Sequence, residues 1–559
     1  MLELNFFNLL PNFLIEELLN FILGLQLFNF ILITVTFLLI ISYLPRNIES
    51  LIFLHRLGFG YFIFSFILNT IETLSRINED NNRIHNFIFY IQSDSTIFHF
   101  FLFFIFLILI IFFYGTIDRF LIQNGDELEF PLLIIFISGS ALILFYVHTL
   151  IEFLLALETL SLASYICVGY ERQNRHSTYA SVQYFILSSI PSGFLILGVS
   201  ILYSKLGVLN FEDLDLNLAN NNISKGIYYF NLSINEINAC FHFKNKEDFS
   251  FLNSLIEEDS LPFLEYFSFN QNILELLNVS SSTRSFIILI GILCILFNFL
   301  FKLTAAPFHF WAPSVYKYAP LVTVTYISIV SKAMIVFLFF KFILTILYPF
   351  IFILTPLFLN IAILTIFVGI LGALGERFIK PFFVYSSMGH VGYMLVGLSL
   401  FSFSGISATF HYLSVYVISS FLMWFILMYS SCKIRYLTSF KILKDINPIL
   451  VLIFAFLIFS MSGIPPLGGF FIKVDVLIAL LDASRFFIGI ILFFFTVITF
   501  FYYLKLIKIL FFEKGVLSIT KKYDLNLTKL QLFVLLFLFL FFYMGFVTIS
   551  TYEIGQSFL

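Results

Sequence analysis

Charged residues are scarce in this chain. Asp, Glu, Lys and Arg make up 11% of its 559 residues, whereas 60% of the residues are hydrophobic. A soluble domain normally carries about a quarter charged residues, because its surface faces water. The composition therefore excludes a water-soluble fold of this length, and most of the surface is expected to face lipid.

Motifs for redox cofactors and nucleotides are missing as well. The four cysteines are widely separated and form no CxxC pair, so their spacing supports neither an iron–sulfur cluster nor a zinc site. No GxGxxG follows a strand and no GxxxxGK[ST] occurs. The sequence predicts that this chain holds no cofactor and no metal and has no nucleic-acid partner, so any electron chemistry takes place on another chain.

What the sequence does contain is a series of long apolar runs. A membrane-spanning helix needs about 20 mostly apolar residues. Fourteen candidate spans centre on residues 28–44, 51–69, 98–116, 131–147, 149–170, 182–203, 284–302, 321–347, 350–374, 382–401, 404–430, 449–480, 486–511 and 530–549. These runs predict an all-α polytopic membrane protein with about fourteen transmembrane helices.

Two of these helices are interrupted by helix-breaking residues, one just after the seventh span and one within the twelfth. Pro307 lies in AAPFH, and Pro465, Pro466, Gly468 and Gly469 cluster in the twelfth span. Proline removes a backbone donor and frees a carbonyl, so both helices are expected to be broken. Broken helices at matching positions in two halves are typical of transporters built from inverted repeats.

This pattern divides the chain into four parts. A polar, acidic stretch at 204–283 interrupts the first repeat; a contact surface and a loop without a mechanistic role remain equal alternatives for it. The predicted parts are N-terminal transmembrane helices at 1–130, a first antiporter-like repeat at 131–347, a second at 348–512, and a connecting loop with a C-terminal transmembrane helix at 513–559.

Ionisable residues inside the apolar runs are the candidate functional residues, because charges in hydrocarbon are costly. They are Glu158 in the fifth span, Lys302 at the end of the seventh, His309 beyond it, Lys332 in the eighth and Lys473 in the twelfth. Burial lowers the pKa of a lysine and a nearby carboxylate raises it again, so a lysine facing a carboxylate can exchange a proton. A proton relay of Glu158, Lys302, His309, Lys332 and Lys473, connected by water, is the functional hypothesis.

Structural roles remain open for each of these residues. Glu158 and Lys302 could form a salt bridge with no transport role, and Lys332 could extend toward an interface. His309 could bond a carbonyl freed by Pro307, and His390 is an even choice between a structural and a functional role. For Lys341 and Lys380, which lie near the ends of spans, reaching toward the interface is the better explanation.

Several segments resemble the antiporter-like membrane subunits of respiratory complex I, the NADH–ubiquinone oxidoreductase. The segments, which run from about residue 131 to 512, are LALETLSLASY, FKLTAAPFHFWAPSVYKYAP, IKPFFVYSSMGHVGYMLVGLSL, SMSGIPPLGGFFIK and TFFYYLKLIKILFF. The PFHFWAPSVYKYAP run and Lys473 are most similar to subunit 2, the quinone-proximal member. The resemblance implies that Glu158, Lys302, Lys332 and Lys473 are proton-relay positions and that His309 is a histidine of the central axis.

The resemblance also implies a function and its partners. The chain would translocate protons as a subunit of NADH:ubiquinone reductase, with neighbouring antiporter-like and other membrane subunits and membrane lipids as partners. The alternatives are a subunit of a stand-alone cation/proton antiporter and a structural subunit with a decayed proton path. Gln183, where the family often has lysine, leaves room for the last alternative, because glutamine cannot hold a charge.

Composition and the amino terminus favour a location. The chain begins MLELNFFNLL, without an evident targeting peptide, and its 82 Phe with abundant Ile, Asn and Lys are typical of A+T-rich coding. Lipid-facing surfaces tolerate exchange among Leu, Ile and Phe. An organelle-encoded, multi-pass protein of the mitochondrial inner membrane is expected, or a plasma-membrane protein in a bacterium.

Overall fold

The computed structural model describes the middle of the chain. The described stretches are 149–171, 174–211, 280–347, 350–429, 435–441, 448–465 and 467–513, with single residues between 133 and 147 and at 214. The expected spans at 28–44, 51–69, 98–116 and 530–549 lie outside the described residues. The span at 131–147 and the insertion at 204–283 lie largely outside them.

The described chain is helical, as the apolar runs predict. Its elements are α6 (Leu150–Val168), α7 (Arg175–Leu206), α13 (Ser280–Lys302), α14 (Trp311–Tyr318), α15 (Leu321–Tyr326), η3 (Ile327–Ser331), α16 (Lys332–Phe342), η4 (Ile343–Leu347), α17 (Ile351–Gly375), α18 (Ile379–Ser399), α19 (Phe403–Tyr429), η6 (Leu437–Phe440), α21 (Pro448–Ser462), α22 (Gly468–Asp482) and α23 (Phe486–Phe511). Apart from α14 and the short η6, each described element from α6 to α23 overlaps one of the expected spans. The helix α14 follows the expected break at Pro307.

Six helical stretches among the described residues are long and apolar enough to cross a membrane. They are Leu150–Val168, Arg175–Leu206, Leu321–Phe342, Ile353–Gly375, Ser404–Leu427 and Phe486–Phe511. Many large apolar side chains on α7, α17 and α23 are exposed, as is expected of surfaces that face lipid. The fold class, an all-α polytopic membrane protein, is confirmed.

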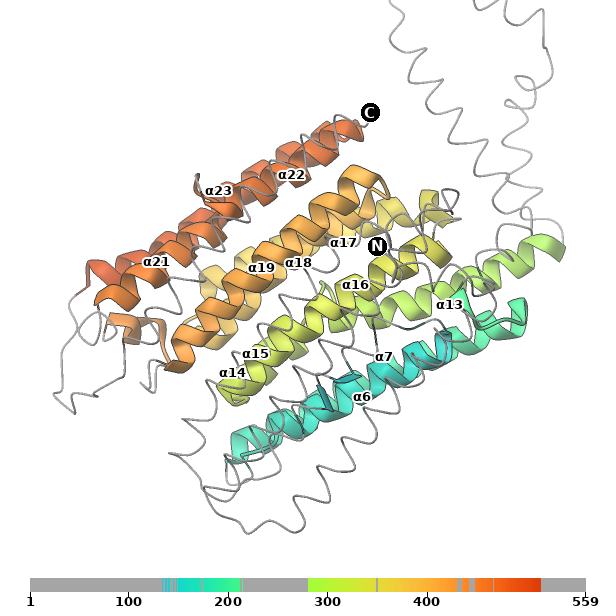
Figure 1. Ribbon diagram of the computed structural model, residues 1–559, viewed down its shortest axis with the longest axis horizontal. Helices are drawn as coiled ribbons and strands as arrows, with labels where there is room; N and C mark the ends of the chain where they lie inside the picture. The colour runs from blue at the N-terminus through green and yellow to red at the C-terminus, as the bar shows by residue number, and fades with distance from the viewer. Residues whose placement is uncertain are drawn as a thin grey trace, which may run out of the picture.

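The helices run side by side in one elongated bundle (Figure 1). The helices α6, α7 and α13 lie along one side of it and α21, α22 and α23 along the opposite side, with α14 to α19 between them. The short helix α14 contacts both α7 and α18, and α19 contacts α18 and α22. Residues far apart in the sequence therefore meet in the middle of the bundle.

Both expected helix breaks are present. The helix α13 ends at Lys302, and non-helical residues precede α14. The helix α21 ends at Ser462, and α22 begins at Gly468. Gly463 has a φ of 86°, a left-handed conformation that favours glycine and turns the chain out of α21. Each broken span thus consists of two half-helices.

The eighth span contains an irregularity that the sequence did not predict. It changes from α15 to the π-helical segment η3, returns to α-helix at Lys332, and becomes π-helical again in η4. A π-helical turn disturbs the regular backbone ladder and often occurs at functional sites. Lys332 therefore sits where the backbone leaves regular helical geometry.

The helices α17 and α18 pack closely because glycines line their contact. A Cβ atom on Gly369 would lie 2.8 Å from the backbone N of Gly389 and 2.8 Å from the carbonyl O of Tyr385. Backbone atoms cannot move aside without separating the helices. Gly369 therefore permits the approach that holds α18 in the centre of the bundle.

Replacing Gly369 tests this packing. We expect Gly369→Ala to destabilise the folded chain by about 1–3 kcal/mol, because the added methyl group overpacks a backbone contact. The measurement is the midpoint temperature at which the detergent-solubilised protein loses solubility. Gly375→Ala is the control, since a Cβ there meets nothing within 4 Å; equal shifts for both variants would contradict the prediction.

Candidate functional site

Lys302 on α13 and Glu158 on α6 lie close together on one side of the bundle. Lys302 Nζ donates a hydrogen bond to the carbonyl O of Leu157 at 3.0 Å, one residue before Glu158. Glu158 Oε2 accepts from Ser161 Oγ at 3.4 Å, while Oε1 is buried without a partner. Among the described contacts no ion pair joins the two side chains, so the expected direct pair is not formed, although the two groups are neighbours.

Lys332 is enclosed in the centre of the bundle. Its side chain is 1% exposed, and Nζ donates to Ser387 Oγ on α18 at 2.8 Å. A lysine that extended toward an interface would be exposed at its tip. The position therefore rules out that interpretation for Lys332.

Lys473 lies on α22, just after the second helix break. Its side chain is 5% exposed, and Nζ donates to the carbonyl O of Ser462 at 2.8 Å. Ser462 is the last residue of α21, and the carboxyl end of a helix carries partial negative charge. The break thus supplies the group that binds the buried ammonium.

The helix α18 connects the two lysines. Its residues Ser387, His390 and Tyr393 recur every three positions, which places them on one side of the helix. Ser387 contacts Lys332, and the ring of Tyr393 lies with its centroid 5.8 Å from Lys473 Nζ. Polar or aromatic groups therefore extend from one buried lysine to the other.

His390 occupies the middle of this row. Its Nδ1 lies 2.8 Å from the hydroxyl of Tyr412 on α19, and its Nε2 lies 3.2 Å from the hydroxyl of Tyr503 on α23. Both ring nitrogens are hydrogen-bonded, and Tyr412 also stacks on Tyr393 with ring centroids 5.8 Å apart. The sequence left open whether His390 has a structural or a functional role. Its two tyrosine partners could not be identified, because they lie 22 and 113 residues away in the sequence.

His309 lies in the break between α13 and α14. Its side chain is buried and its ring lies 4.3 Å, centroid to centroid, from that of Phe310. The structure does not bring His309 into the hydrogen-bonded row along α18, so its place in the relay stays a prediction.

Several buried polar atoms near the first break have no protein partner. They belong to Asn298 on α13, Thr304 in the break and Tyr316 on α14. Buried polar groups without a protein partner are the usual sites of internal water. The region between Lys302 and Lys332 therefore offers side chains that can hold water.

The residues at the ends of spans have local structural roles. Thr149 and Glu152 form a capping box at the start of α6, each side chain bonding the other's backbone N–H. Lys341 Nζ donates to the carbonyl O of Val147, and Lys380 Nζ to that of Ala319. Both lysines are half-buried, and the expectation that they extend toward the interface stays a prediction. Gln183 is half-buried on α7.

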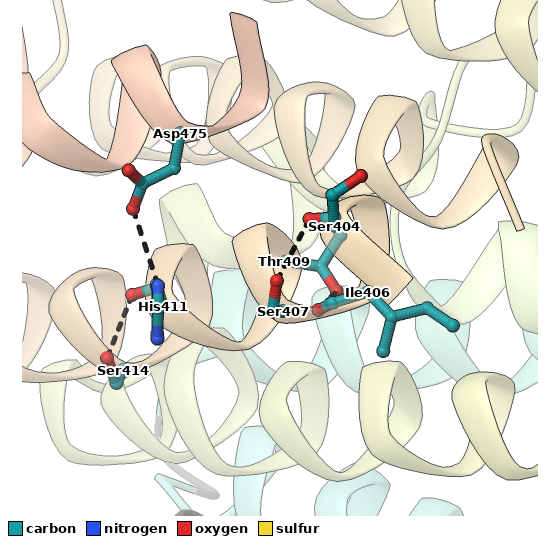
Figure 2. Close-up of polar contacts among 7 residues, drawn as sticks. All are labelled: Ser404, Ile406, Ser407, Thr409, His411, Ser414 and Asp475. Carbon is teal, nitrogen blue, oxygen red and sulfur yellow. Dashed lines mark hydrogen bonds and ion pairs between the residues drawn. The ribbon is translucent and has the colours of Figure 1, made fainter. Parts of the chain in front are cut away.

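One titratable pair was missed by the sequence analysis. His411 Nδ1 on α19 lies 3.4 Å from Asp475 Oδ2 on α22 (Figure 2). Asp475 follows Lys473 by two residues, and both charges stand in an otherwise apolar run. That isolated carboxylate was the signal that could have pointed to the pair.

The fold and these buried groups define a polytopic membrane protein with two broken helices and a row of lysines and histidine between them. The profile of the family described as NADH:quinone oxidoreductase/Mrp antiporter, TM matches residues 148–244 and 264–499, more than half of the chain. The chain belongs to this family. The resemblance to the antiporter-like membrane subunits is thereby confirmed.

Individual relatives agree with the family match. The chain is 26% identical over 492 residues to NADH-quinone oxidoreductase subunit N of Pelagibacter ubique, which covers 87% of this chain and 88% of the relative. It is 29% identical over 402 residues to NADH-ubiquinone oxidoreductase chain 2 of Marchantia polymorpha, covering 71% and 70%. A chain of respiratory complex I from Thermus thermophilus with bound aureothin has a similar fold, with a TM-score of 0.60, 18% identity and coverage of 94% and 96%.

Removing the partner of Lys332 tests the site. We expect Ser387→Ala to destabilise the folded chain by about 2 kcal/mol, because a buried ammonium group loses a hydrogen bond. The midpoint temperature for loss of solubility in detergent measures the effect. Ser399→Ala on the same helix is the control, since its hydroxyl bonds only the carbonyl of Val396; a Ser387→Ala midpoint no lower than that of the control would count against the contact.

Proposed function

We propose that this chain is the proton-translocating, antiporter-like membrane subunit of an NADH:quinone oxidoreductase. It acts as part of an enzyme whose electron transfer takes place on other chains. The expectation that it holds no cofactor stays a prediction. Other membrane subunits, including neighbouring antiporter-like subunits, and membrane lipids are its partners.

The observation that carries the proposal is the row along α18. Lys332, His390 and Lys473 are buried in the middle of the bundle. Lys332 bonds Ser387, which precedes His390 by three residues on α18, and His390 bonds Tyr412. Tyr412 stacks on Tyr393, whose ring faces Lys473. Charged groups buried in a membrane protein are costly, so their presence indicates a function. Because these groups can bind or pass a proton, the function they indicate is proton translocation.

Electrostatics gives the row a way to move a proton. Two ammonium groups in one low-dielectric region repel each other, so a proton gained at one lysine favours release from the other. His390 can exchange a proton with the hydroxyls of Tyr412 and Tyr503 through its hydrogen bonds, and water would complete the path from these groups to each lysine. Lys302 and Glu158 begin the relay on the side of the bundle formed by α6 and α13. Water bound at the polar atoms of Asn298 and Tyr316 connects them to Lys332.

The broken helices support a division of the chain into two repeats. We propose that residues 131–347 and 348–512 are the two antiporter-like units, each with one broken helix and a lysine beside the break. The relatives include NADH-ubiquinone oxidoreductase chain 2 of Marchantia polymorpha and NADH-quinone oxidoreductase subunit N of Pelagibacter ubique. A multi-pass location in the mitochondrial inner membrane, or in a bacterial plasma membrane, fits both.

Lys302→Ala tests the relay. We expect it to lower the number of protons translocated per NADH oxidised more than it lowers the amount of assembled complex, because the change removes a proton carrier and not a packing contact. Proton uptake into sealed membrane vesicles, normalised to assembled complex, is the measurement. Lys508→Ala, an exposed lysine near the end of α23, is the control. If Lys302→Ala abolishes assembly while pumping per assembled complex is unchanged, Lys302 is structural.

Association with the enzyme is tested separately. We expect the chain to migrate, in a native gel of mildly solubilised membranes, with the band that stains for NADH dehydrogenase activity. Mass spectrometry of that band identifies the polypeptide. Its absence from the band, with migration in a smaller assembly, would favour the stand-alone antiporter that the family description also covers.

A further inference from the structure

The pair of His411 and Asp475 lies beside the relay and not within it. Their side chains are 16% and 19% exposed, unlike the enclosed Lys332 and Lys473. Figure 2 shows Asp475 reaching from α22 to His411, while Ser407 and Ser414 on α19 donate to carbonyls of their own helix. Across this part of the interface, the described polar contact between the two helices is that of His411 with Asp475.

The half-helix α22 needs such a contact more than a continuous helix would. Its first residue follows a break at Gly463–Leu467, and the residue before it provides no side-chain cap. The rotation of α22 about its axis is therefore not fixed by a continuous helical backbone. Contacts with its neighbours must fix it, and α19 is the helix that α22 packs against most extensively.

The positions of Lys473 and Asp475 link that rotation to the relay. Two residues correspond to about 200° around an α-helix, so the two side chains leave α22 on nearly opposite sides. Asp475 reaches His411 while Lys473 reaches the carbonyl of Ser462. A rotation of α22 that lengthens one contact also moves the other.

On α19, too, a residue of the His411–Asp475 pair lies next to a residue of the relay. Tyr412, which follows His411 directly, carries the hydroxyl that bonds His390 at 2.8 Å. The helices α19 and α22 thus each carry one residue of the relay and, close to it in sequence, one residue of the His411–Asp475 pair. The pair connects the two helices at the level where the relay passes between them.

We propose that His411 and Asp475 are positioning residues that hold α22 against α19 and thereby set the position of Lys473 relative to Tyr412 and His390. This inference rests on the proposed role of Lys473 in proton translocation. Loss of the pair lets α22 rotate and moves Lys473 Nζ away from the row.

The test is proton translocation per NADH oxidised, measured in vesicles and normalised to assembled complex. We expect His411→Leu and Asp475→Asn each to lower this ratio about fivefold, since a small misplacement of a reacting group has large effects on rate. The exchanged variant, His411→Asp with Asp475→His, restores the pair and is expected to return within about twofold of the natural chain. Ser414→Ala, on the same side of α19, is the matched control and should change nothing.

Lys473→Ala in the same series separates the two ideas. If it lowers the ratio while His411→Leu and Asp475→Asn do not, the positioning role is wrong and the relay stands. If Lys473→Ala has no effect, the relay through Lys473 is wrong and the positioning role with it. Should a single variant fail to assemble, the exchanged variant decides: full pumping supports the pair, and poor pumping in an assembled complex overturns it.

Discussion

The structure depends on one constraint, which is that an ammonium group inside an apolar bundle must have an oxygen within hydrogen-bond reach. Leaving a buried charge unpaired costs several kcal/mol. Lys302 meets the constraint with the carbonyl of Leu157, Lys332 with the hydroxyl of Ser387 and Lys473 with the carbonyl of Ser462. All three partners are neutral dipoles. A neutral partner stabilises the charge without binding it as tightly as a carboxylate would, so each lysine can still give up its proton.

Each of the three lysines lies next to irregular backbone. Lys302 ends α13 at the first break, Lys473 follows the second, and Lys332 follows a π-helical segment. The end of the half-helix α21 leaves carbonyls without a partner in the helix, and that of Ser462 binds Lys473. The second break therefore supplies the partner of one lysine. Lys302 and Lys332 are instead bound by groups on the continuous helices α6 and α18.

The sequence predicted this arrangement in outline. Apolar runs identified the helices, proline and glycine identified the breaks, and isolated charges identified Lys302, Lys332 and Lys473. The partners could not be predicted, because a helix that is apolar on all sides has no polar face to indicate its rotation. Ser387 lies 55 residues from Lys332, and only packing of α18 in the centre brings them together. For the same reason the sequence did not predict that Lys302 bonds the carbonyl of Leu157, the residue next to Glu158.

The contact of Lys332 with Ser387 also connects the two proposed repeats. Lys332 belongs to the first, and Ser387, on α18, belongs to the second. The hydroxyl of Ser387 accepts from Lys332 Nζ at 2.8 Å and donates to the carbonyl of Val384 at 2.7 Å. A hydroxyl that accepts and donates at once transmits a change in the charge of its neighbour, because each hydrogen bond in a chain polarises the next. An ion pair at this place would hold the charge of Lys332 fixed, whereas in the proposed relay the hydroxyl would let the second repeat respond to the protonation of Lys332.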